Sequence, residues 1–422
     1  MITARAFAGK HYAVYGLARS GIATVEALLA SDARVTAWDS KEDARRQAPA
    51  GIEIANLDEA DLAQFDSLVV TPGLPLNRHP IAERARAAGV EIIGDIELFA
   101  RARGELPPHK VVGITGTNGK STTTALIHHI LQTARVPSLM GGNIGLPILA
   151  QDPLPQGGVY VLELSSYQLD LTQSLDCDVA VLLNITPDHL DRYESFGAYA
   201  ASKSRLLTMQ SADQIALIDW TAFMNGLVYP VCGFNGLVLP EWADQERWPA
   251  LQGPHNRDNA AAAIETAAWL GVEPEVIASG LATYRGLPHR MEPVREKGGV
   301  TFVNDSKATN PTATAPALAA FERIRWICGG QAKTDNLDEC APHFGHVRSA
   351  YTIGEAADLF ERLLSRHIAV KNCGKLDVAV REAAADARAG DTVLLSPACA
   401  SFDQFRDFED RGDQFRALVE GL

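Results

Sequence analysis

Short runs of apolar residues alternate along the chain with longer stretches of helical pattern. The first stretch predicts a strand at residues 11–15, a glycine-containing turn, a helix at 21–29 and a second strand at 34–38. Similar apolar runs predict further strands at 67–71, 90–93, 111–115, 159–163, 179–184, 300–304, 325–328, 350–353 and 392–396. Strands that alternate with helices favour parallel sheets covered on both faces, so we expect an α/β protein.

Proline and glycine residues divide this pattern into three parts. Pro107 and Pro108 precede a new strand, and Gly286, Pro288 and Pro293 follow the helical stretches at 258–270 and 274–284. We predict domains at residues 1–98, 99–286 and 287–422. A chain of 422 residues has room for them, at roughly 100–200 residues per domain.

The strongest local signal is a glycine-rich loop between a predicted strand and a predicted helix, GITGTNGKS at 113–121. Glycines let backbone N–H groups converge on phosphate oxygens, and the helix N-terminus adds partial positive charge. Lys120 would pair with the β- and γ-phosphates, and Ser121 or Thr122 would reach a Mg²⁺ ion. In the usual P-loop spacing the first glycine would fall at Ile114, so this is a variant loop. On this evidence an ATPase, a GTPase, a kinase and a ligase all stay open.

An earlier glycine turn, Gly16 to Gly21, also follows a strand and opens a helix, and Asp39 closes the next strand. The middle position is Ala18, whose methyl group obstructs the close approach of a dinucleotide pyrophosphate, so a dehydrogenase is disfavoured. Either another diphosphate binds here, or Gly21 only allows the helix to approach the sheet.

Composition narrows the class of protein. Lys and Arg number 38 against 52 Asp and Glu, a formal charge of −14 that opposes binding to nucleic acid or anionic membranes. The six cysteines form no C-x-x-C pair, which disfavours a disulfide framework or a zinc ribbon. The sequence has neither a signal-peptide pattern at its start nor a run of about 18 apolar residues, so we expect a soluble cytoplasmic protein.

A series of segments, in order along the chain, resembles the Mur ligase family. They are GITGTNGKSTTT (113–124), GGNIGLP (141–147), ELSSYQLD (163–170), NITPDHLDRY (184–193), HNRDNAAAA (255–263), GLPHRMEPV (286–294), NDSKATN (304–310) and SPACASFDQFRDFEDRG (396–412). The last block, with NDSKATN and GDIELF (94–99), is most similar to the branch that adds D-glutamate to UDP-N-acetylmuramoyl-L-alanine in peptidoglycan precursor synthesis.

The resemblance implies a Rossmann-like N-terminal domain that binds UDP, a central P-loop ATPase domain, and a Rossmann-like C-terminal domain that contacts the amino acid. ATP would phosphorylate the precursor carboxylate to an acyl phosphate, and the incoming amine would displace the phosphate. The family also implies two Mg²⁺ ions and a monomer. Its ATP-contacting positions correspond to Gly116, Thr117, Asn118, Gly119, Lys120, Ser121, Thr122, Asn259, Arg290, Asp305 and Lys307.

The metal-binding and catalytic residues are assigned partly from the sequence pattern and partly from the resemblance. Glu163 ends a strand that follows the P-loop strand along the chain, where its carboxylate could hold Mg²⁺ or simply be a surface or capping residue. The resemblance favours the metal role and adds His189 as a second ligand. Lys203, which would otherwise be read as a solvated helix residue, corresponds to the family lysine that CO₂ converts to a carbamate. The catalytic set is then Lys120, His189 and Lys203, and the metal set is Ser121, Glu163, His189 and Lys203.

By the same resemblance, the UDP-precursor would contact Arg19, Ser20, Asp39, Ser40, Lys41, Gly73, Asn143 and Ser165, and the glutamate would contact Thr309, Lys333, Ser401 and Phe408. For Asp305 and Lys307 the alternative is a surface ion pair. Cys399 lies in the last block without a partner histidine, so we interpret it as a packed residue.

Other functions remain as alternatives. A folylpolyglutamate synthase, or a Mur ligase that adds alanine or a diamino acid, would share the ATP machinery, but the N-terminal glycine turn and the last block favour a glutamate-adding Mur ligase. L-glutamate is the alternative substrate. A P-loop switch or motor is disfavoured because it would leave the C-terminal motifs without a purpose.

Overall fold

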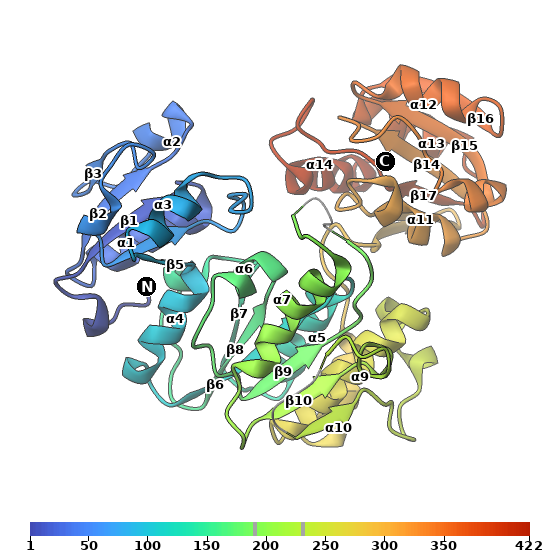
Figure 1. Cartoon of the computed structure of the whole chain (residues 1–422). Helices are drawn as coiled ribbons and strands as arrows, with labels where there is room; N and C mark the ends of the chain where they lie inside the picture. The colour runs from blue at the N-terminus through green and yellow to red at the C-terminus, as the bar shows by residue number, and fades with distance from the viewer. Residues whose placement is uncertain (189–191, 229–232) are drawn as a thin grey trace. The chain divides into compact units, whose positions relative to one another are not determined.

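The computed structural model describes residues 1–188, 192–228 and 233–422. It consists of two compact units, Met1–Tyr284 and Arg285–Leu422. The described residues form three sheets, of which the first two belong to the first unit (Figure 1). Each unit is described by itself below.

The first sheet is parallel and has the order β3-β2-β1-β4-β5. Neighbouring side chains of β1 belong to different hydrophobic clusters, Tyr12 and Val14 to one and Ala13 and Tyr15 to the other, so the strand is buried on both faces. The strands are β1 (His11–Tyr15), β2 (Arg34–Trp38), β3 (Glu53–Ile54), β4 (Ser67–Val70) and β5 (Glu91–Ile93), and the helices are α1 (Arg19–Leu29), α2 (Glu42–Arg46), α3 (Ile81–Ala87) and α4 (Asp95–Ala102).

The second sheet is also parallel, with the order β11-β10-β9-β6-β8-β7. Its strands are β6 (His109–Thr115), β7 (Ser138–Gly142), β8 (Gly158–Glu163), β9 (Val179–Leu182), β10 (Ile215–Ile218) and β11 (Phe234–Gly236). Its helices are α5 (Lys120–Thr133), α6 (Ser166–Asp170), α7 (Phe196–Thr208), α8 (Trp220–Met224), α9 (Pro254–Trp269) and α10 (Pro274–Thr283). β6 lies between β8 and β9, so the loops that leave these three strands emerge at one edge of the sheet.

The second unit contains a mixed sheet with the order β12-β13-β17-β14-β15-β16, in which only the β12–β13 pair is antiparallel among its described strands. Trp326 and Cys328 pack into one cluster and Ile327 into another, so helices cover both faces here too. The strands are β12 (Glu292–Lys297), β13 (Val300–Asn304), β14 (Ile324–Gly329), β15 (Val347–Ile353), β16 (Ala369–Gly374) and β17 (Thr392–Leu395), and the helices are α11 (Pro311–Ala319), α12 (Ala357–Leu364), α13 (Leu376–Asp386) and α14 (Phe408–Glu420).

The α/β architecture predicted from the sequence is confirmed, and each predicted strand is present to within a few residues. Strands that the pattern did not predict include β3, β7, β10, β11, β12 and β16. The predicted boundary after residue 98 falls inside α4, and the one after 286 lies just beyond Tyr284, where the first unit ends. The division into three functional domains stays a prediction. Over the described ranges, every helix is too short or too polar to cross a membrane.

Candidate active site

The glycine-rich loop joins β6 to α5 and takes backbone conformations that need glycine. Gly116 has φ +152° and Gly119 has φ +86°. A Cβ atom at Gly116 would lie 2.8 Å from Leu183 Cβ, and one at Gly119 would lie 2.2 Å from the side-chain oxygen of Asn259. Asn259 is buried in α9, so the structure brings this predicted ATP-contacting residue against the loop. α5 begins directly at Lys120, as a phosphate-binding helix N-terminus requires.

A residue that the sequence reasoning gave no role, Asn184, holds the loop from the end of β9. Its side-chain oxygen accepts from Asn118 N–H at 2.9 Å, its amide nitrogen donates to the Asn118 carbonyl at 3.2 Å, and its own carbonyl accepts from Thr117 N–H at 2.8 Å. Thr117 Oγ1 in turn accepts from Thr186 N–H at 3.0 Å. The available signal was a polar residue at the end of the apolar run 179–184.

Two lysines converge on the carbonyl oxygen of Gly116. Lys120 Nζ donates to it at 2.9 Å and to the Thr117 carbonyl at 2.8 Å, and Lys203 Nζ donates to it at 2.7 Å. Lys203 is only 2% exposed, so the interpretation of this residue as solvated is wrong. Burial, with the nearby charge of Lys120, lowers the pKa of Lys203 to about 7. Above that pH its amine is mostly neutral and nucleophilic.

Glu163, at the end of β8, has the features of a metal ligand. It is 2% exposed, one carboxylate oxygen accepts from Asn143 Nδ2 at 2.8 Å, and the other has no hydrogen-bond partner among the described residues. A buried carboxylate oxygen without a partner is costly unless a cation or water satisfies it. Together with the hydroxyl of Ser121, buried at the start of α5, this donor set fits Mg²⁺, which prefers oxygen ligands and keeps waters and phosphate oxygens for the rest of its shell.

The described part of the chain has no cluster of three or more His, Cys, Asp or Glu side chains that could hold a metal by themselves. The predicted ligand His189 lies outside the described residues. The protein groups that fit Mg²⁺ here are therefore a single carboxylate and a hydroxyl, the usual pattern where a nucleotide supplies the remaining ligands.

The N-terminal glycine turn is built by close packing. A Cβ atom on Gly21 would lie 1.8 Å from the Gly16 carbonyl oxygen, so glycine at this position lets α1 approach the turn. Asp39 fixes the two chain segments beside it, because one of its carboxylate oxygens accepts from Leu17 N–H at 2.8 Å and the other from Lys41 N–H at 2.9 Å.

The remaining residues predicted to contact the UDP-precursor are mostly accessible. Arg19 is exposed and donates to the Gly145 carbonyl at 3.3 Å, which brings the first sheet to the loop that carries Asn143. Ser20 is partly buried, and Ser40, Lys41 and Gly73 are exposed. Ser165 instead caps α6, in a reciprocal capping box with Gln168. Its side chain therefore has a structural role in addition to the predicted contact with the UDP-precursor.

In the second unit, Asp305 and Lys307 do not form the surface ion pair considered as their alternative role. Asp305 is buried, accepts from Ser396 Oγ at 2.7 Å and from Met291 N–H at 3.2 Å, and burial raises its pKa to about 7. Lys307 Nζ instead lies 3.7 Å from the centre of the Phe408 ring. Arg290 is exposed in the segment that leads into β12.

Of the four residues predicted to contact glutamate, Lys333 and Thr309 lie together, with Nζ 3.4 Å from Oγ1. Ser401 is buried at 2% exposure, and Phe408 begins α14. Cys399 is fully buried and burial raises its pKa to about 12, as expected for a packed thiol.

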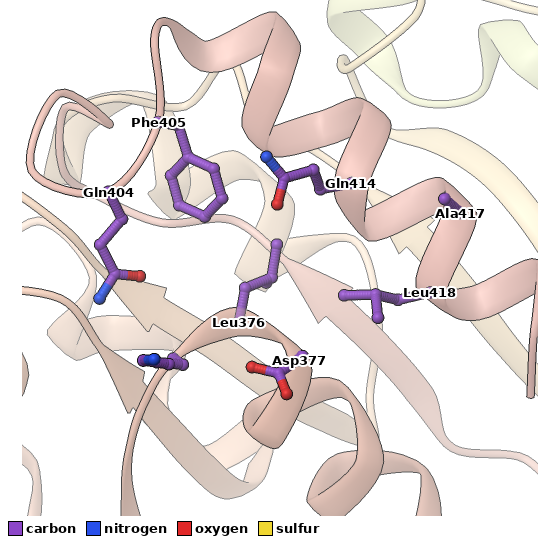
Figure 2. Close-up of a pocket in the computed structure, with 8 residues that line it drawn as sticks. Leu376, Asp377, Gln404, Phe405, Gln414, Ala417 and Leu418 are labelled. Carbon is purple, nitrogen blue, oxygen red and sulfur yellow. The ribbon is translucent and has the colours of Figure 1, made fainter.

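The second unit also contains a groove of about 650 Å³. It is formed by the start of α13, the second half of α14 and residues 404–405, and Figure 2 shows Leu376, Phe405 and Leu418 directed toward its interior. None of the predicted glutamate-contacting residues lines it. Ser401 lies beside the groove, because its carbonyl accepts from Gln404 N–H at 3.2 Å and from Phe405 N–H at 2.9 Å.

Three segments of the chain match known domains. Residues 10–94 match the Mur ligase MurD-like N-terminal domain, residues 114–223 the Mur ligase middle domain, and residues 289–399 the glutamate ligase domain of Mur ligases. The chain is 60% identical to a UDP-N-acetylmuramoylalanine–D-glutamate ligase of Novosphingobium aromaticivorans, covering 100% of this chain and 97% of the relative. It is 59% identical to the enzyme of the same name from Sphingopyxis alaskensis, covering 100% of both chains.

Solved structures share the fold at low sequence identity. A MurF ligase from Thermotoga maritima, in complex with ADP, superimposes with a TM-score of 0.59 at 17% identity and covers 99% of this chain and 97% of its own. A UDP-N-acetylmuramate–alanine ligase from the same organism gives 0.58 at 15% identity and covers 98% and 99%. With full-length relatives at 60% and 59% identity and the three-domain Mur ligase fold, the chain belongs to the Mur ligase family.

Proposed function

We propose that this protein is an ATP-dependent ligase that joins D-glutamate to UDP-N-acetylmuramoyl-L-alanine, forming ADP and phosphate, in peptidoglycan precursor synthesis. The observation that carries the proposal is the 60% identity, over the whole chain, to a relative named for this reaction. The site supports it, because a phosphate-binding loop, two lysines and a buried carboxylate occur at one sheet edge, and one carboxylate oxygen has no hydrogen-bond partner in the described part of the chain.

In this proposal the backbone N–H groups of residues 116–121 bind the ATP phosphates, and Lys120 exchanges its two carbonyl contacts for phosphate oxygens. Glu163 and Ser121 would hold one Mg²⁺, and the family resemblance implies a second ion that His189 and Lys203 would hold. When bound, Mg²⁺ neutralises charge that develops on the transferring phosphoryl group.

The chain's own residues then orient the reactants. Asn143 fixes the carboxylate of Glu163, and Asn184 fixes the peptide groups of the loop, so both groups are held in one orientation. The precursor's carboxylate accepts the γ-phosphoryl group and becomes an acyl phosphate. The amine of glutamate, bound by Thr309, Lys333, Ser401 and Phe408, attacks the acyl carbon, and phosphate leaves.

Lys203 is assigned to carbamylation. Its neutral Nζ attacks CO₂ and loses one proton to solvent, which leaves an anionic carbamate in place of the amine. The carbamate adds a negative charge and two oxygen atoms, the ligand type that Mg²⁺ prefers over an amine nitrogen. We further place the enzyme in the cytoplasm, as a monomer.

Phosphate release from ATP tests the proposed function. Purified protein should release phosphate only when both UDP-N-acetylmuramoyl-L-alanine and D-glutamate are present. L-glutamate, L-alanine and a diamino acid are the controls. Equal turnover with L-glutamate would overturn the stereochemical assignment, and phosphate release without any amino acid would favour a simple ATPase.

A further inference from the structure

Arg411, in the first turn of α14, is a fully buried arginine whose guanidinium lies among oxygen atoms of two loops. It is 0% exposed. None of the carboxylates in residues 285–422, all of which the structure describes, forms an ion pair with it. A buried cation without an anionic partner is expensive, so its hydrogen bonds must satisfy it.

Those hydrogen bonds reach both loops. From the loop after β13, Ser306 accepts twice, with Oγ at 3.0 Å from Nε and its carbonyl at 2.8 Å from Nη2. From the loop after β17, the Cys399 carbonyl accepts from Nη1 and Nη2 at 3.1 Å each, and the Ala400 carbonyl accepts from Nη1 at 3.4 Å. One planar group therefore fixes two chain segments that are about a hundred residues apart.

The two loops carry residues of different proposed subsites. Ser306 lies between Asp305 and Lys307, which are assigned to ATP, and Ala400 precedes Ser401, which is assigned to glutamate. Phe408 is also connected to the loop after β13. Its carbonyl accepts from Ser306 Oγ at 2.8 Å, and its ring lies under Lys307 Nζ.

We propose that Arg411 is a positioning residue that holds the nucleotide-contacting and glutamate-contacting loops of the second unit in one arrangement and so couples the two subsites. This inference rests on the proposed function. Arginine suits the task because its guanidinium has five N–H donors in a planar fork, whereas a lysine ammonium has three donors at a single point. Burial lowers the pKa of Arg411 to about 10, so the side chain stays charged at neutral pH.

The first test is Arg411→Lys, which keeps the positive charge and removes the planar set of five N–H donors. We expect the KM for D-glutamate to rise about tenfold or more and kcat to fall, with the KM for the UDP-precursor within about twofold of wild type. Arg325→Lys is the matched control, because Arg325 is also largely buried and bonds Asp391 and Ser349 at the opposite edge of the same sheet. This control should leave the KM for glutamate unchanged.

The second test is chemical rescue. Guanidinium added at millimolar concentration to Arg411→Gly should restore part of kcat/KM for glutamate, and methylammonium should not. If Arg411→Gly does not fold, Ser306→Ala takes its place, since it removes the Nε acceptor and the link to Phe408 while four hydrogen bonds of Arg411 remain. We expect that variant to raise the KM for glutamate by about three- to fivefold.

Two outcomes would overturn the positioning role. One is an unchanged glutamate KM in Arg411→Lys, and the other is an equal change in the KM of all three substrates together with a lowered melting temperature. A failure of the proposed function would be visible separately, because the wild-type enzyme itself would then not require D-glutamate.

Discussion

The side-chain amide of Asn143 donates to one carboxylate oxygen of Glu163 at 2.8 Å, and the other oxygen of Glu163 has no hydrogen-bond partner among the described residues. Asn143 lies in the loop after β7, and Glu163 ends the adjacent strand β8. The contact fixes the orientation of the carboxylate, so its free oxygen is held ready for a cation.

Glu163→Gln should therefore impair the enzyme through its metal. Glutamine keeps the shape of the side chain and an acceptor for Asn143, but it removes the negative charge. We expect turnover to fall about 10²-fold or more, and the Mg²⁺ concentration for half-maximal activity to rise. A Mg²⁺ titration of phosphate release measures both quantities. Glu105→Gln, at the surface near Arg5, is the control, and an unchanged Mg²⁺ requirement in Glu163→Gln would remove Glu163 from the metal set.

Lys120→Ala should nearly abolish turnover and spare binding of the UDP-precursor. The ammonium of Lys120 donates to two loop carbonyls, which keeps it at the phosphate-binding loop. Its removal should lower kcat by about 10²–10³-fold, the effect typical of losing a group that stabilises transition-state charge. Calorimetric titration with UDP-N-acetylmuramoyl-L-alanine should give an affinity like that of wild type. Joint loss of both properties would contradict the assignment of precursor binding to residues outside the loop.

Lys203 gives a prediction about small carboxylates and pH. Because the pKa of Lys203 is lowered to about 7, the fraction of neutral amine rises as pH increases through 7, and only the neutral form reacts with CO₂. Enzyme depleted of CO₂ should thus regain activity faster at pH 8 than at pH 6 when the concentration of dissolved CO₂ is the same at both pH values. Lys203→Ala should be inactive, and formate or acetate should partly restore its turnover.

Lys110→Ala is the matched control for this experiment, since Lys110 precedes the same loop on β6 but stacks on Trp269. It should be active and unresponsive to carboxylates. Absence of recovery in Lys203→Ala at every concentration of carboxylate would argue against a carbamate.

The sequence predicted what depends on local pattern and missed what depends on distant contacts. The central strands β6, β8 and β9 were predictable because they are buried on both faces and form continuous apolar runs. The edge strand β16 was not, because three of its six residues are polar or glycine and much of it is exposed.

The same distinction holds for the site. The P-loop is a contiguous motif, whereas the burial of Lys203 results from a contact with Gly116, 87 positions away, and the burial of Arg411 from loops around 306 and 399. A lysine or arginine on a predicted helix is normally solvated, so no local pattern indicates such contacts. The family resemblance supplied Lys203, and Arg411 was found only from the structure.

Asp305 gives a pH dependence of stability. Burial raises its pKa from 3.8 to about 7, so between about pH 4 and 7 the folded protein keeps a proton on Asp305 that the unfolded chain has lost. Its contribution to the free energy of unfolding is therefore fully present below pH 4 and is lost as pH rises through 7.

Asp305→Asn removes this titration. Wild type should be more stable relative to Asp305→Asn at pH 5 than at pH 8, as measured by urea unfolding at both values. The same substitution at the exposed Asp338 should give no such difference between the two pH values. A constant stability difference for Asp305→Asn across this range would mean that Asp305 titrates outside it.

Glu97 gives a prediction about how the first sheet is held to the second. This residue of α4 is 1% exposed and accepts from Gln173 N–H at 2.6 Å, Ser174 N–H at 2.9 Å, Ser174 Oγ at 2.8 Å and Arg101 Nε at 2.9 Å. Glu97→Ala removes the shared acceptor of two backbone N–H groups, a hydroxyl and a guanidinium, so the free energy of unfolding should fall by about 1.5–3 kcal/mol. Glu42→Ala, which removes only a surface pair with Arg46, should leave the urea midpoint unchanged. If the two variants unfold at the same urea concentration, water must replace Glu97 as the acceptor for these donors. The two sheets would then be held together by the packing of α4 without Glu97.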